Sequence, residues 1–343
     1  MSPIELMNIA MMEARNGGRS VRPNPLVGAA LVSRDGKVVS AFHARYGEAH
    51  AERVLFEKCK TQNVDTKGAT LAVTLEPCSH FGKTPPCVDA VIEAKIAKVI
   101  IPFADPNPLV ASKGIRKLKE AGIEVVSGIE VSAAFDLNKE WLWAQKLKRP
   151  FVTLKYACSK NSVWKSPEKT WITTLESRLD AMTLRGRVDA ILTSGATLRE
   201  DNPQMNLRDQ NAAELVEHQP DLYVLSKDKT LNLQKYKASQ VSKRNIYLVS
   251  QPSLESLLAE LFKKGVRDLM IEAGPTLSRS FFESSLVDEV WKYQSNEILE
   301  GPVESMDSYL EKFQIIKSHL IGVDQFTFYT QRNLGHYINY NEE

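Results

Sequence analysis

Residues 77–87 of this chain read Pro77-Cys78-Ser79-His80-Phe81-Gly82-Lys83-Thr84-Pro85-Pro86-Cys87, and residues 50–52 read His50-Ala51-Glu52. One imidazole and two thiolates can hold a zinc ion and leave its fourth position for a water, whose pKa the metal lowers toward ~7. A carboxylate two residues beyond the imidazole can lie beside that water without binding the metal. His50, Cys78 and Cys87 are therefore candidate zinc ligands, and Glu52 is a candidate catalytic residue.

This arrangement is typical of hydrolytic zinc deaminases. Glu52 would take a proton from the attacking water and return it to the leaving amine, because ammonia leaves far more readily than amide anion. The usual cysteine pair has two intervening residues, whereas here residues 79–86 intervene. Two alternatives stay open: a structural zinc site with His80 as its fourth ligand, or two buried cysteines and no metal. The coincidence of Glu52 and Pro77 with the three ligands favours the catalytic site.

The composition restricts the kind of substrate. The chain has 343 residues, enough for two domains, and 43% of them are hydrophobic. Its 44 basic and 42 acidic residues give a net charge of +2, which provides no field for non-specific nucleic-acid binding. We expect a small-molecule substrate and no nucleic-acid partner. Reduced thiolates at a metal site favour a cytoplasmic enzyme, and no apolar run approaches the ~20 residues that span a bilayer.

Alternating strand and helix patterns predict an α/β fold in both halves. The first half has expected helices at 3–14, 50–59, 88–94, 114–121 and 131–146, and expected strands at 26–32, 37–42, 70–75, 97–102 and 123–126. The charged run before Pro150 predicts a boundary, which divides the chain into residues 1–147, residues 148–332 and a polar tail, 333–343. The second half has expected strands at 151–157, 190–194, 222–225, 245–249, 269–272, 315–320 and 325–330, and expected helices at 175–185, 254–264 and 276–284.

Four segments carry a family resemblance: Pro23-Asn24-Pro25-Leu26-Val27-Gly28, His50-Ala51-Glu52, the run from Thr74 to Cys87, and Asp105-Pro106-Asn107-Pro108. Together they closely resemble the deaminase half of the bifunctional riboflavin-biosynthesis deaminase–reductase, over about residues 3–126. The resemblance implies a cytidine-deaminase-like three-layer domain with one zinc ion. It also implies a phosphorylated pyrimidine substrate, 2,5-diamino-6-(5-phosphoribosylamino)pyrimidin-4-one, which loses its 2-amino group to water.

The same resemblance implies substrate contacts. Asn24 and His43 would meet the pyrimidine or the ribose, and Lys83 would meet the phosphate with Thr84 and Asn107 nearby. The plainer interpretations are a turn at an asparagine between prolines and a solvated lysine.

In the second half, Ile271-Glu272-Ala273-Gly274-Pro275-Thr276-Leu277 follows an expected strand and opens an expected helix, where backbone N–H groups can bind phosphate. With Lys155, the segment from Thr193 to Pro203 and Arg208, it resembles the reductase half of the same enzyme, similar in fold to dihydrofolate reductase, over about residues 150–330. The resemblance implies that NADPH delivers hydride to the sugar C1′ and converts the ribosyl group to ribityl. Lys155 and Glu272 would be catalytic. The implied NADPH contacts are Ala157, Trp171, Thr197, Asp201, Ser226, Gly274, Pro275, Thr276, Leu277, Ser278, Arg279 and Ser280. The implied substrate contacts are Lys169, Arg185, Met205, Arg208 and Glu272.

Plainer interpretations of these charges are solvated arginines at positions 185 and 208, and a helix-capping carboxylate at Glu272. Trp171 is expected to start the helix that Arg185 ends. The sequence departs from the family pattern at Asn161-Ser162, where Asp-Gly is expected, at residues 165–168 and at residues 294–297. An impaired or ligand-binding-only reductase therefore stays open, as does a nucleic-acid base deaminase. The family resemblance also implies a homo-oligomer.

Overall fold

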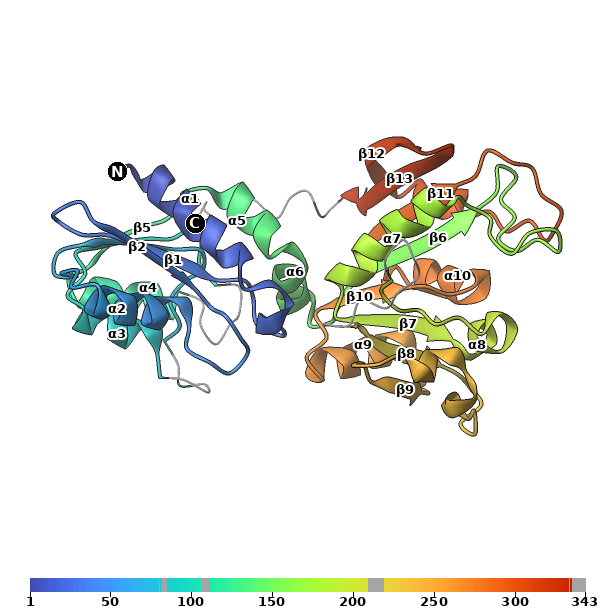
Figure 1. Ribbon diagram of the computed structural model, residues 1–343, viewed down its shortest axis with the longest axis horizontal. Coiled ribbons are helices and arrows are strands. Elements are labelled where there is room, and N and C mark those ends of the chain that lie inside the picture. Colours follow the sequence, from blue (N-terminus) through green and yellow to red (C-terminus); the bar gives the residue numbers. More distant parts are fainter. Residues whose placement is uncertain (80, 82–84, 106–111, 209–218, 333, 335–343) are drawn as a thin grey trace. The chain divides into compact units, whose positions relative to one another are not determined.

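A computed structural model of the chain describes residues 1–79, 81, 85–105, 112–208, 219–332 and 334. The chain divides into two compact units, one formed by Met1–Leu147 and the other beginning at Lys148. Each unit has its own sheet (Figure 1). Each also has its own hydrophobic core.

The first unit is built on a five-stranded sheet in the order β2-β1-β3-β4-β5. Its strands are β1 (Gly28–Val32), β2 (Val38–Phe42), β3 (Thr70–Val73), β4 (Lys98–Ile100) and β5 (Glu124–Val126). The β1 strand pairs antiparallel with β2 and β3, while β3, β4 and β5 are parallel. Its helices are α1 (Pro3–Arg15), η1 (Gly18–Val21), α2 (Ala51–Thr61), α3 (Cys87–Glu93), α4 (Lys113–Glu120), α5 (Val131–Leu137) and α6 (Lys139–Leu147).

Helices cover both faces of this sheet, because successive strand residues point to opposite sides. Leu31 and its neighbours on one face pack against α2, α3 and α4. Ala30 and its neighbours on the other face pack against α1, α5 and α6. The expected three-layer fold is thus confirmed (Figure 1).

One expected helix, 131–146, is wrong: the structure has α5 and α6 separated at Asn138, whose φ is −131°. The Asn138 side chain accepts a hydrogen bond from the Leu26 N–H at 2.8 Å and donates one to the Leu26 carbonyl at 2.8 Å. This side-chain pairing with a distant backbone competes with helix continuity, as asparagine often does.

The second unit has an eight-stranded sheet in the order β12-β13-β11-β6-β10-β7-β8-β9. Its strands are β6 (Phe151–Cys158), β7 (Ala190–Ser194), β8 (Asp221–Leu225), β9 (Ile246–Val249), β10 (Asp268–Ile271), β11 (Glu289–Gln294), β12 (Phe313–Ile321) and β13 (Asp324–Gln331). The strands from β11 to β9 are parallel, and β13 and β12 add antiparallel at the edge. Its helices are α7 (Leu175–Arg187), α8 (Gly195–Asp201), η2 (Leu233–Lys235), η3 (Lys237–Gln240), α9 (Leu254–Lys263), α10 (Pro275–Glu283) and α11 (Asp307–Leu310).

Helices α9 and α10 pack on one face of this sheet, and α7 and α8 pack on the other. The sequence patterns did not predict β11, whose polar Lys292 is only 8% exposed and is paired with Asp307. They also placed Trp171 at the start of a helix. The structure begins α7 at Leu175, because Thr174 is the N-cap and accepts a hydrogen bond from the Ser177 N–H.

Candidate functional sites

The three candidate metal ligands converge in the first unit. His50 is the N-cap of α2, Cys78 follows β3, and Cys87 is the first residue of α3. Their ligand atoms all lie within 4.8 Å of one another. The His50 Nδ1 is 3.2 Å from the Cys87 Sγ and 3.6 Å from the Cys78 Sγ. One nitrogen and two sulfurs at this spacing fit a zinc ion, which prefers nitrogen and thiolate ligands.

Glu52 lies in the first turn of α2 with 3% of its surface exposed. Burial, and then the nearby Cys78, raise the pKa of its carboxyl group. A hydrogen bond from Cys87 lowers the pKa of Cys78 to about 4 despite burial, and the same contact raises that of Cys87 well above its ordinary value. The hydrogen bond with Cys78 raises the pKa of His50. The lowered pKa of Cys78 favours the thiolate form that zinc binds, and the raised pKa of Glu52 suits a proton carrier.

The end of the long cysteine insert is anchored by Arg53, which sequence reasoning missed. Its guanidinium donates to the carbonyls of Pro85 and Pro86, at 3.3 and 3.0 Å. Arg53 follows Glu52 directly. The N-cap and first turn of α2 thus contribute the metal ligand His50, the carboxyl group of Glu52 and a guanidinium that holds the residues before Cys87. An arginine beside the His-Ala-Glu motif is the sequence signal for this contact.

Asn24 and His43 lie next to the metal ligands. The Asn24 Nδ2 is 3.2 Å from the His43 Nε2, and the His43 Nδ1 is 3.0 Å from the Ala49 carbonyl. His43 therefore donates from Nδ1 and accepts at Nε2, and burial lowers its pKa and keeps the ring neutral. The rings of His43 and His50 meet edge-on with centroids 5.4 Å apart. His80, Lys83, Thr84 and Asn107 lie outside the described residues.

Most of the expected cofactor residues of the second unit follow the carboxyl ends of its parallel strands. Ala157 is on β6, Thr197 is on α8 after β7, and Ser226 follows β8. The segment from Gly274 to Ser280 follows β10 and forms the start of α10. These ends lie at one edge of the sheet, which is where open α/β sheets bind ligands.

A charged cluster lies beside this edge. The Glu272 carboxylate accepts two hydrogen bonds from Arg185, at 2.9 and 2.8 Å, and one from the Lys155 ammonium at 3.4 Å. Although burial alone would raise it, the charges of Arg185 and Lys155 lower the pKa of Glu272 to about 2. Glu272 is thus not a helix cap, because Gly274 is the N-cap of α10.

Arg185 and Arg208 differ in their surroundings. Arg185 is 8% exposed and also donates to the Asn206 carbonyl at 2.9 Å, so it is not a solvated helix end. Arg208 is half-buried, and burial followed by the charge of Arg185 lowers its pKa. Its guanidinium donates to the Gln204 side chain at 3.3 Å.

Other expected contact residues are engaged elsewhere. Lys169 is ion-paired with Glu297. Asp201 is paired with Lys165 at 3.4 Å. Trp171 is 57% exposed and is covered by the Arg178 guanidinium at 4.5 Å. Met205 is buried with a φ of 50°.

The departure at Asn161-Ser162 preserves a tight turn. Ser162 has a φ of 61°, the left-handed region that glycine adopts most readily. The Asn161 amide donates to the Leu299 carbonyl at 3.0 Å and accepts from the Leu299 N–H at 3.1 Å. Residues 158–165 are further joined to residues 294–304 by the Val163–Val303 bridge. The two segments are thus held together by backbone and side-chain hydrogen bonds.

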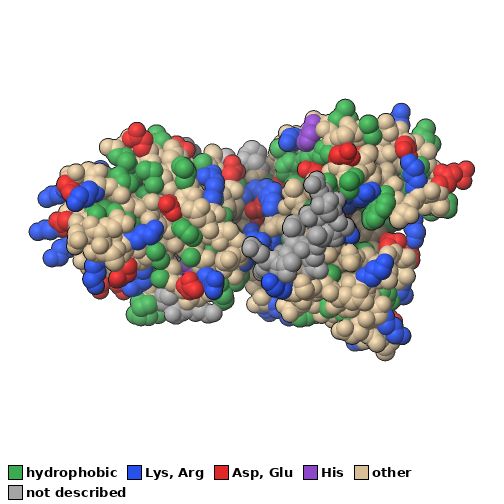
Figure 2. All heavy atoms as spheres, in the orientation of Figure 1, with side chains coloured by type: hydrophobic (Ala, Val, Ile, Leu, Met, Phe, Trp, Pro, Cys, Tyr) green, Lys and Arg blue, Asp and Glu red, His purple; other side chains and the backbone are tan. Residues whose placement is uncertain are grey.

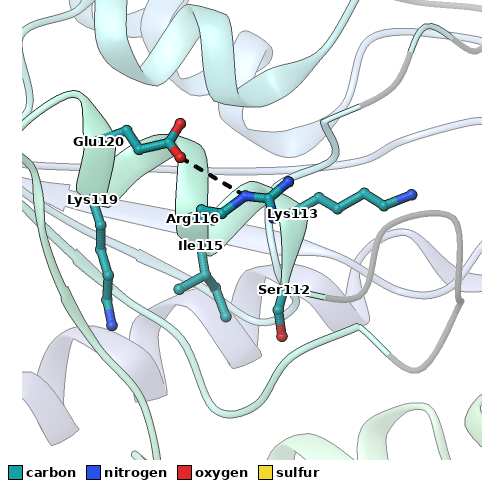
Figure 3. A pocket seen from close by; sticks show the side chains of 6 residues that line it. All are labelled: Ser112, Lys113, Ile115, Arg116, Lys119 and Glu120. Carbon is teal, nitrogen blue, oxygen red and sulfur yellow. Dashed lines mark ion pairs between the residues drawn. The ribbon is translucent and has the colours of Figure 1, made fainter.

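A shallow hollow of ≈ 450 Å³ lies over α4. It is lined by Ser112, Lys113, Ile115, Arg116, Lys119 and Glu120 (Figure 3). None of these is an expected site residue. Basic and acidic side chains are interspersed over the visible face of each unit (Figure 2).

The fold and the two sites define a bifunctional enzyme, in which a zinc-dependent deaminase unit precedes a reductase unit of the dihydrofolate-reductase type. Residues 2–102 match the cytidine and deoxycytidylate deaminase zinc-binding region, and residues 150–302 match the RibD C-terminal domain. The chain belongs to the RibD family of riboflavin biosynthesis proteins. This confirms the resemblance found in the sequence.

Two relatives illustrate the match. The riboflavin biosynthesis protein RibD of Bacillus amyloliquefaciens is 35% identical over 95% of this chain and 92% of its own length. That of Escherichia coli is 33% identical over 95% of each chain.

Solved structures agree. Acinetobacter baumannii RibD is 32% identical with a TM-score of 0.82, over 96% of this chain and 98% of its own. The Thermotoga maritima diaminohydroxyphosphoribosylaminopyrimidine deaminase/5-amino-6-(5-phosphoribosylamino)uracil reductase is 28% identical with a TM-score of 0.83 and the same coverage. Among the described residues, no helix is long and apolar enough to cross a membrane.

Proposed function

We propose that this chain catalyses two successive steps of riboflavin synthesis. The first is hydrolytic removal of the 2-amino group from 2,5-diamino-6-(5-phosphoribosylamino)pyrimidin-4-one, and the second is reduction of the ribosyl group to ribityl by NADPH. We assign the first step to residues 1–147 and the second to residues 148–332, with residues 333–343 as a tail. The observation that carries this proposal is the cluster of His50, Cys78 and Cys87 beside the buried Glu52.

In the deaminase unit, His50, Cys78 and Cys87 would hold the zinc ion, which supplies Lewis acidity that makes water a nucleophile at neutral pH. Glu52 accepts the proton of the attacking water and delivers it to the departing amine, so that a C–N bond is exchanged for a carbonyl and ammonia leaves. Its buried carboxyl group, with a raised pKa, supports this role.

The rest of the deaminase pocket orients the substrate. The Asn24 amide, held by His43, faces the pyrimidine or the ribose. Lys83, Thr84 and Asn107 are assigned to the phosphate on the family resemblance alone.

In the reductase unit, residues at the carboxyl edge of the sheet would hold NADPH, which would supply the hydride for C1′ of the ring-opened sugar. The supporting observation is the convergence of Ala157, Thr197, Ser226 and the start of α10 at this edge. Trp171 and Asp201 are retained as cofactor contacts from the family pattern, and Lys169 and Met205 as substrate contacts.

We assign to Lys155 the role of proton donor to the reacting sugar, and its hydrogen bond to Glu272, at 3.4 Å, would fix its position. Arg185 is already hydrogen-bonded to Glu272, so we assign the substrate phosphate to Arg208. Arg185 is assigned the role of orienting the Glu272–Lys155 pair. A guanidinium binds phosphate in a planar, bidentate geometry.

We further propose a cytoplasmic homo-oligomer that acts on a small phosphorylated molecule and not on nucleic acid. The net charge of +2 supports a small substrate over nucleic acid, and four free cysteines support the cytoplasm. The homo-oligomer rests on the family resemblance alone.

One incubation tests both catalytic steps. The full chain, loaded with zinc, is mixed with the diaminopyrimidinone phosphate with and without NADPH, and ammonia and NADPH oxidation are followed together. Ammonia should appear in both reactions, and NADPH oxidation should follow it. Ammonia release without NADPH oxidation would leave the second unit with a binding or scaffolding role only. Activity on RNA that falls steeply with salt, and none on the mononucleotide, would favour a nucleic-acid deaminase.

A further inference from the structure

A second buried carboxylate lies close to the zinc-ligand cluster. Glu76 is 4% exposed and stands two residues before Cys78. Its Oε2 accepts hydrogen bonds from the N–H groups of Asp105 and Ser112, at 2.9 and 3.0 Å. Its Oε1 accepts from the N–H groups of Gly114 and Ile115, at 2.8 and 3.2 Å. Four backbone donors thus fill the acceptor sites of one carboxylate.

The contact caps α4 from outside the helix. Ser112, its N-cap residue, has a φ of 57° and makes no capping hydrogen bond with its own side chain. The first N–H groups of a helix need acceptors, and a negative charge is favourable there. Glu76, in the irregular segment that follows β3, supplies both the acceptor oxygens and the negative charge.

Helix α4 also approaches the segment after β3 very closely. A Cβ added at Gly114 would lie 2.3 Å from the Pro77 carbonyl oxygen and 3.0 Å from the Glu76 Oε1. Only a residue without a side chain fits here, so α4 is seated directly on the Glu76–Pro77 backbone that leads into Cys78.

We propose that Glu76 is a positioning residue of the first site: by accepting hydrogen bonds from four backbone N–H groups of Asp105 and the start of α4, it fixes the segment after β3 that presents Cys78. The proposal rests on the zinc site assigned above. Cys78 lies beyond the end of β3 at Val73, and the contact of Glu76 with α4 holds this irregular segment in place. Groups hydrogen-bonded to the ligands themselves commonly contribute ~10- to 100-fold to metal affinity. Glu76 acts on Cys78 through the backbone that joins them, so the low end of this range applies.

The contact of Glu76 and Pro77 with the start of α4 is called the junction below. Two variants disturb it in different ways. Glu76→Gln keeps the shape but turns one acceptor oxygen into an NH₂ group that faces two N–H donors. Gly114→Ala leaves the carboxylate intact and forces α4 away from Pro77. Alanine normally strengthens a helix relative to glycine, so a harmful effect of Gly114→Ala would come from the close approach itself.

Ile123→Val is the matched control. It removes one methyl group from the hydrophobic core into which Leu118 of α4 packs, just after the end of α4, and leaves the junction unchanged. Each full-length variant is loaded with zinc and titrated with a coloured chelator. Cobalt(II) substitution then reports ligand geometry through its thiolate absorption bands, and thermal unfolding reports stability.

We expect both junction variants to bind zinc at least about tenfold more weakly and to show altered cobalt bands. The control should lower the thermal midpoint yet keep wild-type zinc affinity. Wild-type zinc affinity and cobalt bands in both junction variants would overturn the proposal, as would equal zinc loss in the control. Failure of both junction variants to fold would make the contact a requirement of folding and would also overturn it. An absence of zinc binding by the wild-type chain would instead refute the metal site.

Discussion

Replacing Glu272 by glutamine removes the carboxylate that Arg185 and Lys155 share. The folded-state pKa of Glu272 is about 2, below its ordinary value of 4.5. The stabilisation from this carboxylate is therefore fully present above about pH 4.5 and is lost as the pH falls through about 2. A shift of this size corresponds to about 3 kcal/mol at neutral pH, of which about 2 kcal/mol disappears between about pH 5 and about pH 3.

The measurement is urea unfolding of wild type and Glu272→Gln at several pH values. Hydrogen exchange measured on peptides from β6 and β10 reports the unfolding free energy of the second unit separately from that of the first. At neutral pH the variant should be less stable by roughly 3 kcal/mol, since two cations lose their partner. The difference in unfolding free energy between wild type and variant should narrow by about 2 kcal/mol between about pH 5 and about pH 3. A gap that stays constant over this range would refute the reasoning. Glu300→Gln, an exposed carboxylate of the same unit, should show no such change.

Three further substitutions test the two units. Glu52→Gln should slow ammonia release by about 10²- to 10⁴-fold, as followed by an ammonia assay. NADPH titration should show unchanged cofactor binding. Ammonia release at the wild-type rate would remove Glu52 from the mechanism. Ser162→Gly should raise the free energy of unfolding by up to about 1 kcal/mol in urea titrations, because φ is 61°, whereas Ser162→Ala should not; equal effects would show that the backbone is unstrained. Arg53→Ala should weaken zinc binding several-fold in chelator competition, and an unchanged affinity would mean that other contacts hold Cys87.

The parts of the fold that local patterns encode were predictable. Asp35-Gly36 indicated the hairpin between β1 and β2, and the structure pairs these strands in that way. The zinc-ligand cluster was predictable for a related reason: its residues stand at element ends that a short motif marks, and the structure brings those residues together.

Contacts between distant residues were not predictable in this way. The break at Asn138 depends on Leu26, which is 112 positions away, and the engagement of Arg185 depends on Glu272, which is 87 positions away. Periodicity describes a single element and carries no information on such partners. The β11 strand was missed for the same reason, because its buried Lys292 reads as a surface residue until Asp307 is placed beside it.

The pairing of Asn161 with Leu299 has a consequence for engineering. A chimera that imports the Asp-Gly turn of a relative would place a carboxylate against the Leu299 carbonyl and lose the donor that this oxygen requires. Segments 158–165 and 294–304 therefore form a single exchangeable module, and grafts that transplant both together should retain the fold that grafts of either one disrupt.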